Sequence, residues 1–180
     1  MATRICVAKW RLHGVVASRT WMACFQQRYT TASTSTDSVR SFLLYADGAS
    51  RGNPGQAGCG AVLATLSGDI VATKKLYLGD GVTNNAAEYH GLLLALQLAR
   101  ERAAQDVALH LDSELVVKQM QGAYRVKNVG LQPLYQQAKL ACEGMSVKFH
   151  AVPRKENSVA DKLANEAIDD HNSQERQESK

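Results

Sequence analysis

The chain has 180 residues, of which 45% are hydrophobic, a length and composition typical of one globular domain with a hydrophobic core. It contains no run of about 18 apolar residues, so the sequence predicts no membrane-spanning helix. The formal net charge is +4, but residues 1–36 hold five basic residues and no acidic residue. Without these five, 16 basic residues stand against 17 acidic ones, so the rest of the chain is close to neutral.

The N-terminal segment differs from the rest of the chain in composition. Residues 1–36 contain nine serines and threonines and end in the low-complexity run "TTASTST". An arginine-rich, serine-rich and acid-poor segment is typical of organellar transit peptides. We therefore predict that residues 1–37 are a cleaved targeting presequence, for the mitochondrion or, alternatively, the plastid. The other interpretation is a basic arm that helps to hold nucleic acid.

Two of the four cysteines, Cys59 and Cys142, lie outside this segment. They are 83 residues apart and show no metal-ligand spacing. This pattern favours two buried thiols in a reducing compartment over a metal site.

The predicted elements begin with three strands and continue with helices and strands in alternation. A glycine-rich turn over residues 48–56 follows the first strand, and Ser67-Gly68-Asp69 is a hairpin signal between the second and third. Alanine and leucine at helical spacing predict the long helix that follows, with Thr83 or Asn84 as its cap. The predicted strands are 41–47, 57–66, 70–79, 106–111 and 145–152, and the predicted helices are 84–103, 113–122, 130–144 and 156–170.

This order predicts an α/β fold with a mixed sheet. The first three strands form two antiparallel hairpins, and the later strands alternate with helices, which favours parallel additions covered by helices on the faces of the sheet. We expect one domain over residues 38–170, followed by a polar flexible tail over 171–180.

Four carboxylates stand in settings that require an explanation. Asp47 and Asp112 each come where an apolar strand ends, and a carboxylate there costs desolvation unless it is compensated. Two parallel strands would place both carboxylates side by side, and a divalent metal ion would compensate their repulsion. Glu88 and Asp161 lie near the starts of two predicted helices, where an acid also favours the helix N-terminus. Asp47 alone is equally compatible with a turn-initiating aspartate.

Taken with their flanking residues, the four acids resemble one family. The segments "YADGASRGNPG", "TNNAAEYHGLLLAL", "LDSELVVKQM" and "ENSVADKLANEA" are similar, in this order, to the four acidic motifs of the type I ribonuclease H family. The resemblance covers residues 41 to 169, and each motif extends well beyond its acid.

The resemblance implies a ribonuclease H-like fold, in which the first and fourth strands of a five-stranded mixed sheet are adjacent. It also implies an endoribonuclease that hydrolyses the RNA strand of RNA–DNA hybrids. Asp47, Glu88, Asp112 and Asp161 would be catalytic and would bind two Mg²⁺ ions about 3.5–4 Å apart, with Mn²⁺ as a possible substitute. One ion would activate the attacking water and the other would stabilise the leaving 3′ oxygen.

The resemblance also assigns substrate contacts. Gly48 and the other glycines of the turn would let the nucleic-acid backbone approach closely. Asn53 resembles a minor-groove contact, and Asn84 and Asn85 resemble a pair of asparagines that meet the hybrid. Neutral amides can distinguish ribose from deoxyribose through the 2′-hydroxyl. The alternative role for Asn84-Asn85 is a helix cap.

Three features depart from the family pattern: the loop before the last acid, the residue at position 114, and the segment "QGAYRVKNVG", which is too short for the basic handle of some bacterial relatives. The loop "VPRKEN" lacks the histidine that many members carry before the last acid, and His150 falls in a predicted strand. Arg154 lies in this loop and would assist phosphate release, unless it is only a solvated charge. Glu114 stands where many relatives have a substrate-contacting glutamine; it would accept a hydrogen bond from the hybrid, or lie on the helix surface.

The expected partner is an RNA–DNA hybrid, and no membrane partner is expected. Three alternatives stay open: a hybrid- or RNA-binding module without turnover, a fragment of a retroelement polymerase, and a nuclease that also cleaves double-stranded RNA. The presence of all four acids argues against the first, and the absence of polymerase sequence argues against the second.

Overall fold

The computed structural model of the chain describes residues 40–178, so the predicted presequence lies outside the described residues. Within them, strands and helices follow one another in the predicted order, and one short 3-10 helix precedes the last helix. The elements are β1 (Ser41–Gly52), β2 (Gly55–Ala64), β3 (Ile70–Val82), α2 (Asn84–Glu101), β4 (Asp106–Leu111), α3 (Glu114–Met120), α4 (Gln132–Ala141), β5 (Ser146–Ala151), the 3-10 helix η1 (Arg154–Asn157) and α5 (Ser158–Glu178).

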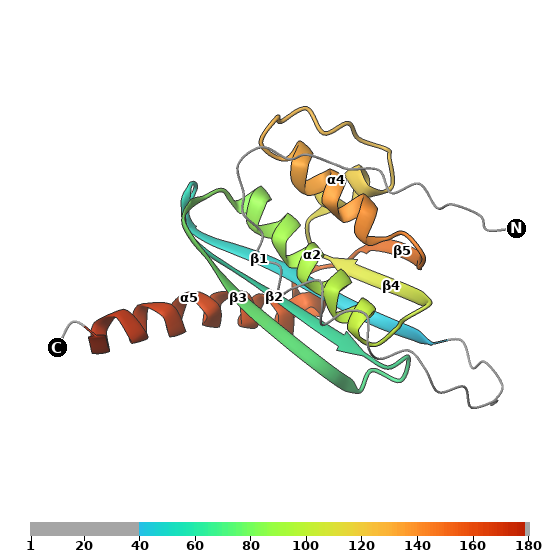
Figure 1. Cartoon of the computed structure of the whole chain (residues 1–180), viewed down its shortest axis with the longest axis horizontal. Coiled ribbons are helices and arrows are strands. Elements are labelled where there is room, and N and C mark those ends of the chain that lie inside the picture. Colours follow the sequence, from blue (N-terminus) through green and yellow to red (C-terminus); the bar gives the residue numbers. More distant parts are fainter. Residues whose placement is uncertain (1–39, 179–180) are drawn as a thin grey trace, which may run out of the picture. The chain divides into compact units, whose positions relative to one another are not determined.

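The five strands form one mixed sheet in the order β3-β2-β1-β4-β5 (Figure 1). The strand pairs β1–β2 and β2–β3 are antiparallel, whereas β1–β4 and β4–β5 are parallel. This confirms the predicted sheet, including the adjacency of the first and fourth strands. Tyr45 of β1 is in register with His110 of β4, so the chain reaches Asp47 and Asp112 two residues further along both strands.

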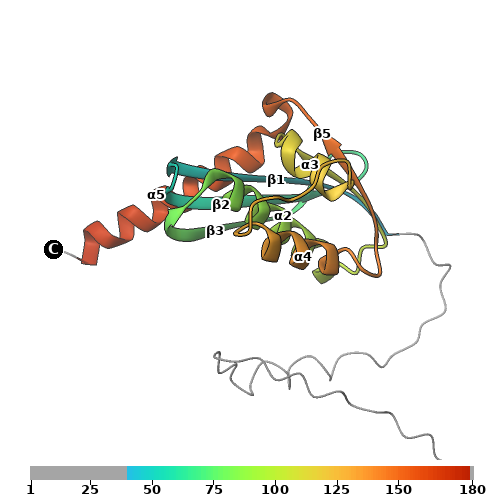
Figure 2. The ribbon, with the colours of Figure 1, turned by 90° about the horizontal axis from the view of Figure 1, so that it is seen from above.

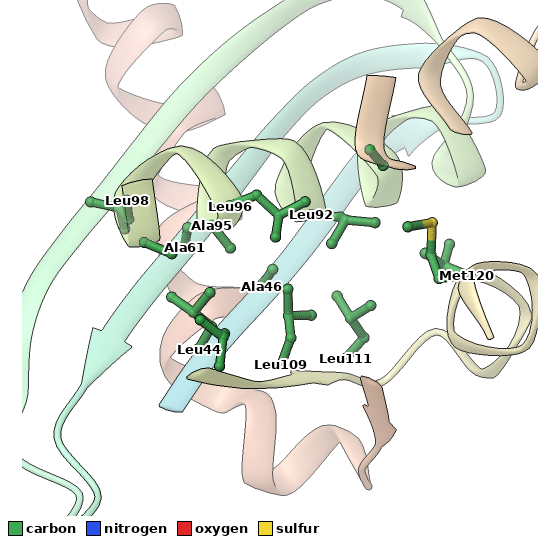
Figure 3. Packing of buried hydrophobic residues seen from close by; sticks show 14 of the residues in the cluster. Leu44, Ala46, Ala61, Leu92, Ala95, Leu96, Leu98, Leu109, Leu111 and Met120 are labelled. Carbon is green, nitrogen blue, oxygen red and sulfur yellow. The ribbon is translucent and has the colours of Figure 1, made fainter. Parts of the chain in front are cut away.

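Helices cover the two faces of the sheet in separate layers (Figure 2). The helix α2 lies across β1 and β2 on one face, with α4 packed against α2. On the other face α5 crosses β1, β2 and β3. The core between α2 and the sheet is aliphatic (Figure 3), and its members include Leu44, Ala46, Ala61, Leu92, Ala95, Leu96, Leu109 and Leu111.

The helix α2 forms where the sequence predicts it. Thr83 is its N-cap, and the Thr83 hydroxyl accepts a hydrogen bond from the backbone N–H of Ala86. Its apolar residues recur at spacings of three and four, so one face is buried against the sheet. At the start of this face the buried Tyr89 donates a hydrogen bond of 2.8 Å to Gln119, which ties α2 to α3.

Glycines allow the helices α2 and α5 to lie close to the sheet. A β-carbon on Gly48 would come 2.0 Å from the backbone of Ala87, and one on Gly91 would come 2.4 Å from the carbonyl oxygen of Asp47. On the opposite face, a β-carbon on Gly60 would come 2.4 Å from the backbone of α5. The space beside Gly48, predicted to admit the nucleic-acid backbone, is therefore filled by the protein's own helix α2.

Two boundaries differ from the sequence prediction by five residues or more. The strand β1 runs five residues past Asp47 because residues 48–52 pair with β2, and this leaves only Asn53-Pro54 at the hairpin tip. The helix α5 continues to Glu178, so residues 171–178, predicted as a flexible tail, are helical. Polar contacts with the sheet, described below, explain this extension. No helix within residues 40–178 is long and apolar enough to cross a membrane.

Candidate active site

Three of the four predicted acids meet at one end of the sheet. Asp47 lies in β1, Asp112 follows the last residue of β4, and Glu88 lies in the second turn of α2. One carboxylate oxygen from each residue lies within 4.8 Å of the other two. Asp47 and Glu88 are only 4% and 7% exposed, so two of the three charges are almost fully removed from water.

Burial and mutual repulsion change the acidity of this cluster. Desolvation, with smaller contributions from the charges of Glu88 and Asp112, raises the pKa of Asp47 from 3.8 to about 9. Desolvation and the charge of Asp112 likewise raise the pKa of Glu88 from 4.5 to about 8, although the backbone of Gly48 donates a hydrogen bond to this carboxylate. Full ionisation of the cluster at neutral pH therefore requires a positive charge beside it.

The donor set fits a hard divalent cation. All the groups are carboxylate oxygens, which Mg²⁺ and Mn²⁺ prefer, and no thiol belongs to the cluster. The Oε2 atom of Glu88 is buried and has no hydrogen-bond partner within the described part of the chain. A buried carboxylate oxygen without a partner is costly, and coordination to a metal ion would satisfy it.

Asp161 lies beside the cluster and does not form part of its tight core. It is in the first turn of α5, its side chain is 26% exposed, and its charge contributes to the raised pKa of Asp47. Its carboxylate is paired with the guanidinium of Arg154, the first residue of η1. Arg154 is close enough to lower the pKa of Glu88. The predicted loop arginine thus supplies the nearby positive charge.

A further residue supports the site: Asn157 is buried and is not among the residues predicted from the sequence. Asn157 is 1% exposed, and its side-chain amide donates to the Ala46 carbonyl oxygen (2.8 Å) and to Oδ1 of Asp112 (3.0 Å). It therefore links the middle of β1 and the residue after β4 to the start of α5. The signal was the asparagine inside the segment "ENSVADKLANEA", four residues before the last acid.

The predicted asparagines cluster at the N-terminus of α2. Asn84 and Asn85 are both exposed in its first turn. Asn53, at the tip of the β1–β2 hairpin, accepts a hydrogen bond of 3.2 Å from the backbone N–H of Asn84. Because Thr83 is the N-cap, the side chains of Asn84 and Asn85 are not needed as caps.

Glu114 and His150 lie outside the carboxylate cluster. Glu114 is exposed at the start of α3 and forms an ion pair with Lys118 one turn later, so its charge is partly neutralised. His150 lies in β5, as predicted, and its ring stacks on that of His110 with centroids 5.2 Å apart. A strand position in a stacked pair suits a structural role better than that of a mobile loop histidine.

Known proteins resemble this chain over most of the described domain. The family model "Reverse transcriptase-like" matches residues 45–167. The Bifunctional protein Rv2228c of Mycobacterium tuberculosis is 44% identical over 71% of this chain, which spans only 35% of that protein's length. Ribonuclease HI of Halobacterium salinarum is 43% identical, over 70% of this chain and 63% of its own.

Solved structures agree with these matches. RNase H1 from Halobacterium salinarum superposes with a TM-score of 0.70 at 42% identity, covering 72% of this chain and 98% of that one. LC11-RNase H1, solved in complex with an RNA/DNA hybrid, has a TM-score of 0.69 at 36% identity and covers 72% and 98%.

The order of the strands, with one carboxylate in the first strand and one directly after the adjacent fourth strand, defines a ribonuclease H-like domain. Its sequence motifs, family match and structural relatives lead to one assignment within this class. The chain belongs to the type I ribonuclease H family.

Proposed function

We propose that this chain is a divalent-cation-dependent endoribonuclease that hydrolyses the RNA strand of RNA–DNA hybrids. The observation that carries the proposal is the buried cluster of Asp47, Glu88 and Asp112, which is costly to the fold unless a cation binds there. The relatives named ribonuclease H, and the LC11 structure with an RNA/DNA hybrid, support the reaction and the substrate class.

The four acids would hold two Mg²⁺ ions, with Mn²⁺ as a substitute. Asp47, Glu88 and Asp112 form the centre of this site, and Asp161 joins it when its carboxylate leaves Arg154. Bound metal ions supply activation of a water molecule and stabilisation of charge on the attacking and leaving oxygens. The buried setting strengthens these interactions because little water screens them.

Residues around the cluster would bind and orient the hybrid. Asn84 and Asn85 present exposed amides that can donate to, and accept from, a 2′-hydroxyl. Asn53 extends this surface at the hairpin tip, and the backbone of Gly48 contributes by fixing Glu88. Glu114 would accept a hydrogen bond at the rim of the site.

Arg154 would act in place of the loop histidine that many members of the family carry. Its side chain is 74% exposed yet paired with Asp161, so it can turn from the carboxylate to a phosphate without leaving water. A guanidinium binds phosphate oxygens in a bidentate manner but does not exchange protons at neutral pH. We therefore propose that Arg154 assists the departure of the phosphate product and does not transfer a proton.

A panel of duplexes tests the function. The full chain is incubated with labelled RNA–DNA hybrid, double-stranded RNA, double-stranded DNA and DNA with one ribonucleotide, each with Mg²⁺, Mn²⁺ or EDTA. The test variant is Asp112→Asn. The matched control is Asp106→Asn, the same change at the opposite end of β4.

The outcomes separate the candidate functions. Metal-dependent cleavage of the hybrid's RNA strand, lost in Asp112→Asn and kept in Asp106→Asn, supports the proposal. Additional cleavage of double-stranded RNA widens the substrate class. Binding of the hybrid without cleavage of any duplex contradicts the enzyme and supports a binding module.

We also propose that residues 1–37 direct the protein to an organelle, the mitochondrion first and the plastid second. The support is compositional: five basic and no acidic residues over 1–36, with nine serines and threonines. Residues 1–37 fused to a fluorescent protein should colocalise with an organelle marker. A diffuse signal would contradict the proposal.

A further inference from the structure

The C-terminal half of α5 contacts both strands of the β1–β2 hairpin close to its tip. Asp169 forms an ion pair of 2.8 Å with Arg51 of β1. Three residues later, on the same face of α5, Asn172 exchanges two side-chain hydrogen bonds of 3.1 and 3.2 Å with Gln56 of β2. Arg51 and Gln56 are opposite each other in the hairpin, so α5 contacts both members of one cross-strand pair.

A second set of contacts fixes the same part of α5 to the edge strand β3. His171 stacks on Tyr77, with ring centroids 3.8 Å apart and an angle of 16° between the planes. Lys75 forms ion pairs with Asp170 (2.8 Å) and Glu166 (3.2 Å). Four consecutive residues, 169–172, therefore all contact the sheet, which explains why this polar segment is helical.

The hairpin tip connects these contacts to the proposed substrate surface. Only Gly52, Asn53, Pro54 and Gly55 lie beyond the Arg51–Gln56 pair. From this tip Asn53 accepts the hydrogen bond of the Asn84 backbone N–H, at the start of α2. The orientation of Asn53 and of the first turn of α2 thus depends on the position of the hairpin, which the contacts with α5 fix.

We propose that residues 169–172 position the β1–β2 hairpin tip for binding of the RNA–DNA hybrid. This inference rests on the proposed function. The four residues are positioning residues: they act on the substrate only through Asn53 and Asn84. The carboxylates are placed by other contacts, namely the approach of α2 to Gly48 and the bonds of Asn157. Loss of the α5–hairpin contacts should therefore weaken substrate binding and leave the chemical step intact.

The individual contacts are modest in strength. Arg51 and Asp169 are 41% and 62% exposed, and exposed ion pairs contribute little because water screens them. The amide pair is partly buried and adds two neutral hydrogen bonds. Removing both contacts together should raise KM for the hybrid about five- to tenfold, whereas each alone should raise it about twofold.

The test measures kcat and KM for hybrid cleavage with the full chain. The test variant is Asp169→Ala/Asn172→Ala, and the matched control is Gln174→Ala, an exposed α5 position beyond these contacts. The variant Gln56→Ala removes the amide pair from the hairpin side and changes no residue of α5. The exchange Arg51→Asp/Asp169→Arg restores the ion pair with reversed charges.

We expect a raised KM with kcat within twofold of wild type in the double variant and a smaller rise in Gln56→Ala. We also expect near wild-type values in the control and the charge exchange. An unchanged KM, or a fall in kcat at constant KM, would overturn the positioning role.

If the wild type does not cleave the hybrid, the proposed function is wrong, and the positioning role is tested by binding alone. The same variants are then compared by the Kd for a fluorescent hybrid. A raised Kd in the double variant supports the positioning role, and an unchanged Kd, or no binding by the wild type, overturns it.

Discussion

Gly48 of β1 and Ala87 of α2 are in backbone contact, so close that a β-carbon on Gly48 would come 2.0 Å from the carbonyl carbon of Ala87. This contact brings the next residue of α2, Glu88, close to Asp47 in β1. The Gly48 backbone then donates a hydrogen bond to the Glu88 carboxylate. Because Gly48 has no side chain, α2 can approach β1 closely enough to bring Glu88 beside Asp47.

Replacement of Gly48 by alanine should damage both the fold and the site. The new methyl group would collide with backbone, which no side-chain rotation can relieve. We expect the free energy of unfolding to fall by about 1–3 kcal/mol and hybrid cleavage to fall more than about tenfold, since each tenfold loss corresponds to about 1.4 kcal/mol of transition-state binding. Denaturant unfolding and cleavage assays measure the two effects.

The matched control for this change is Gly130→Ala. There the nearest atom to a new β-carbon is the side-chain oxygen of Asn128, at 3.3 Å. Equal stability and activity of Gly48→Ala and Gly130→Ala would show that the contact with α2 is unimportant.

Asn157→Ala should separate β1, β4 and α5 at the site. It removes the hydrogen bonds to the Ala46 carbonyl oxygen and to Asp112, and it leaves the carbonyl oxygen buried without its partner. We expect a loss of about 2–4 kcal/mol in stability and a fall mainly in kcat. Asn165→Ala, which removes a bond within α5 to the Asp161 carbonyl oxygen, is the control. A variant with normal kcat would contradict the supporting role of Asn157.

The metal-free protein should lose stability as the pH rises from 7 to 9. The pKa values of Asp47 and Glu88 are about 9 and 8 in the fold, against 3.8 and 4.5 without it. The folded state therefore holds protons that the unfolded state has lost, and raising the pH through 8 and 9 favours unfolding. Below about pH 6.5, His90 and His110 have the opposite effect on stability. Burial lowers their pKa values, so the unfolded state binds protons there that the folded state does not.

Thermal unfolding in EDTA across this pH range measures the effect. Mg²⁺ should raise Tm most at pH 9, because it binds the ionised cluster of the folded state. Asp47→Asn should flatten the slope in EDTA. A Tm in EDTA that is constant or rises between pH 7 and 9 would show that the cluster is not buried as described.

Arg154→Ala should tighten the binding of Mg²⁺ while slowing turnover. The guanidinium pairs with Asp161 and favours the ionised form of Glu88, so it competes with a cation for the same carboxylates. Because Arg154 is largely exposed, the gain is small, about two- to fivefold in Kd. Titration calorimetry gives the affinity, with Lys155→Ala as the control for loss of one nearby positive charge. Weaker Mg²⁺ binding in Arg154→Ala would contradict this competition.

Much of the fold was predictable because local patterns and sheet topology agree. Apolar runs followed by Asp47 and Asp112, with three strands before the first helix, predicted a mixed sheet, and the resemblance to the ribonuclease H family implied the adjacency of β1 and β4. The alanine- and leucine-rich run predicted α2 and the position of Glu88 on it. The three carboxylates that the structure brings together follow from these elements.

What the sequence did not reveal depends on contacts between distant residues. Gly48 was interpreted as an approach point for nucleic acid because the residue that fills its space, Ala87, lies 39 positions away in the chain. The motif around Asn157 does not reveal its role, since both its acceptors lie in other parts of the chain. The helical residues 171–178 are polar throughout, and their partners on β2 and β3 are known only from the structure.

Cleavage of a hybrid labelled on both strands tests the central claim most directly. With Mg²⁺, the wild-type chain should cut the RNA strand and leave the DNA strand intact. EDTA or Asp47→Asn should abolish cutting, because the carboxylate cluster then holds no cation. Cutting of the RNA strand that persists in EDTA and in Asp47→Asn would contradict the assignment of the chemistry to this cluster.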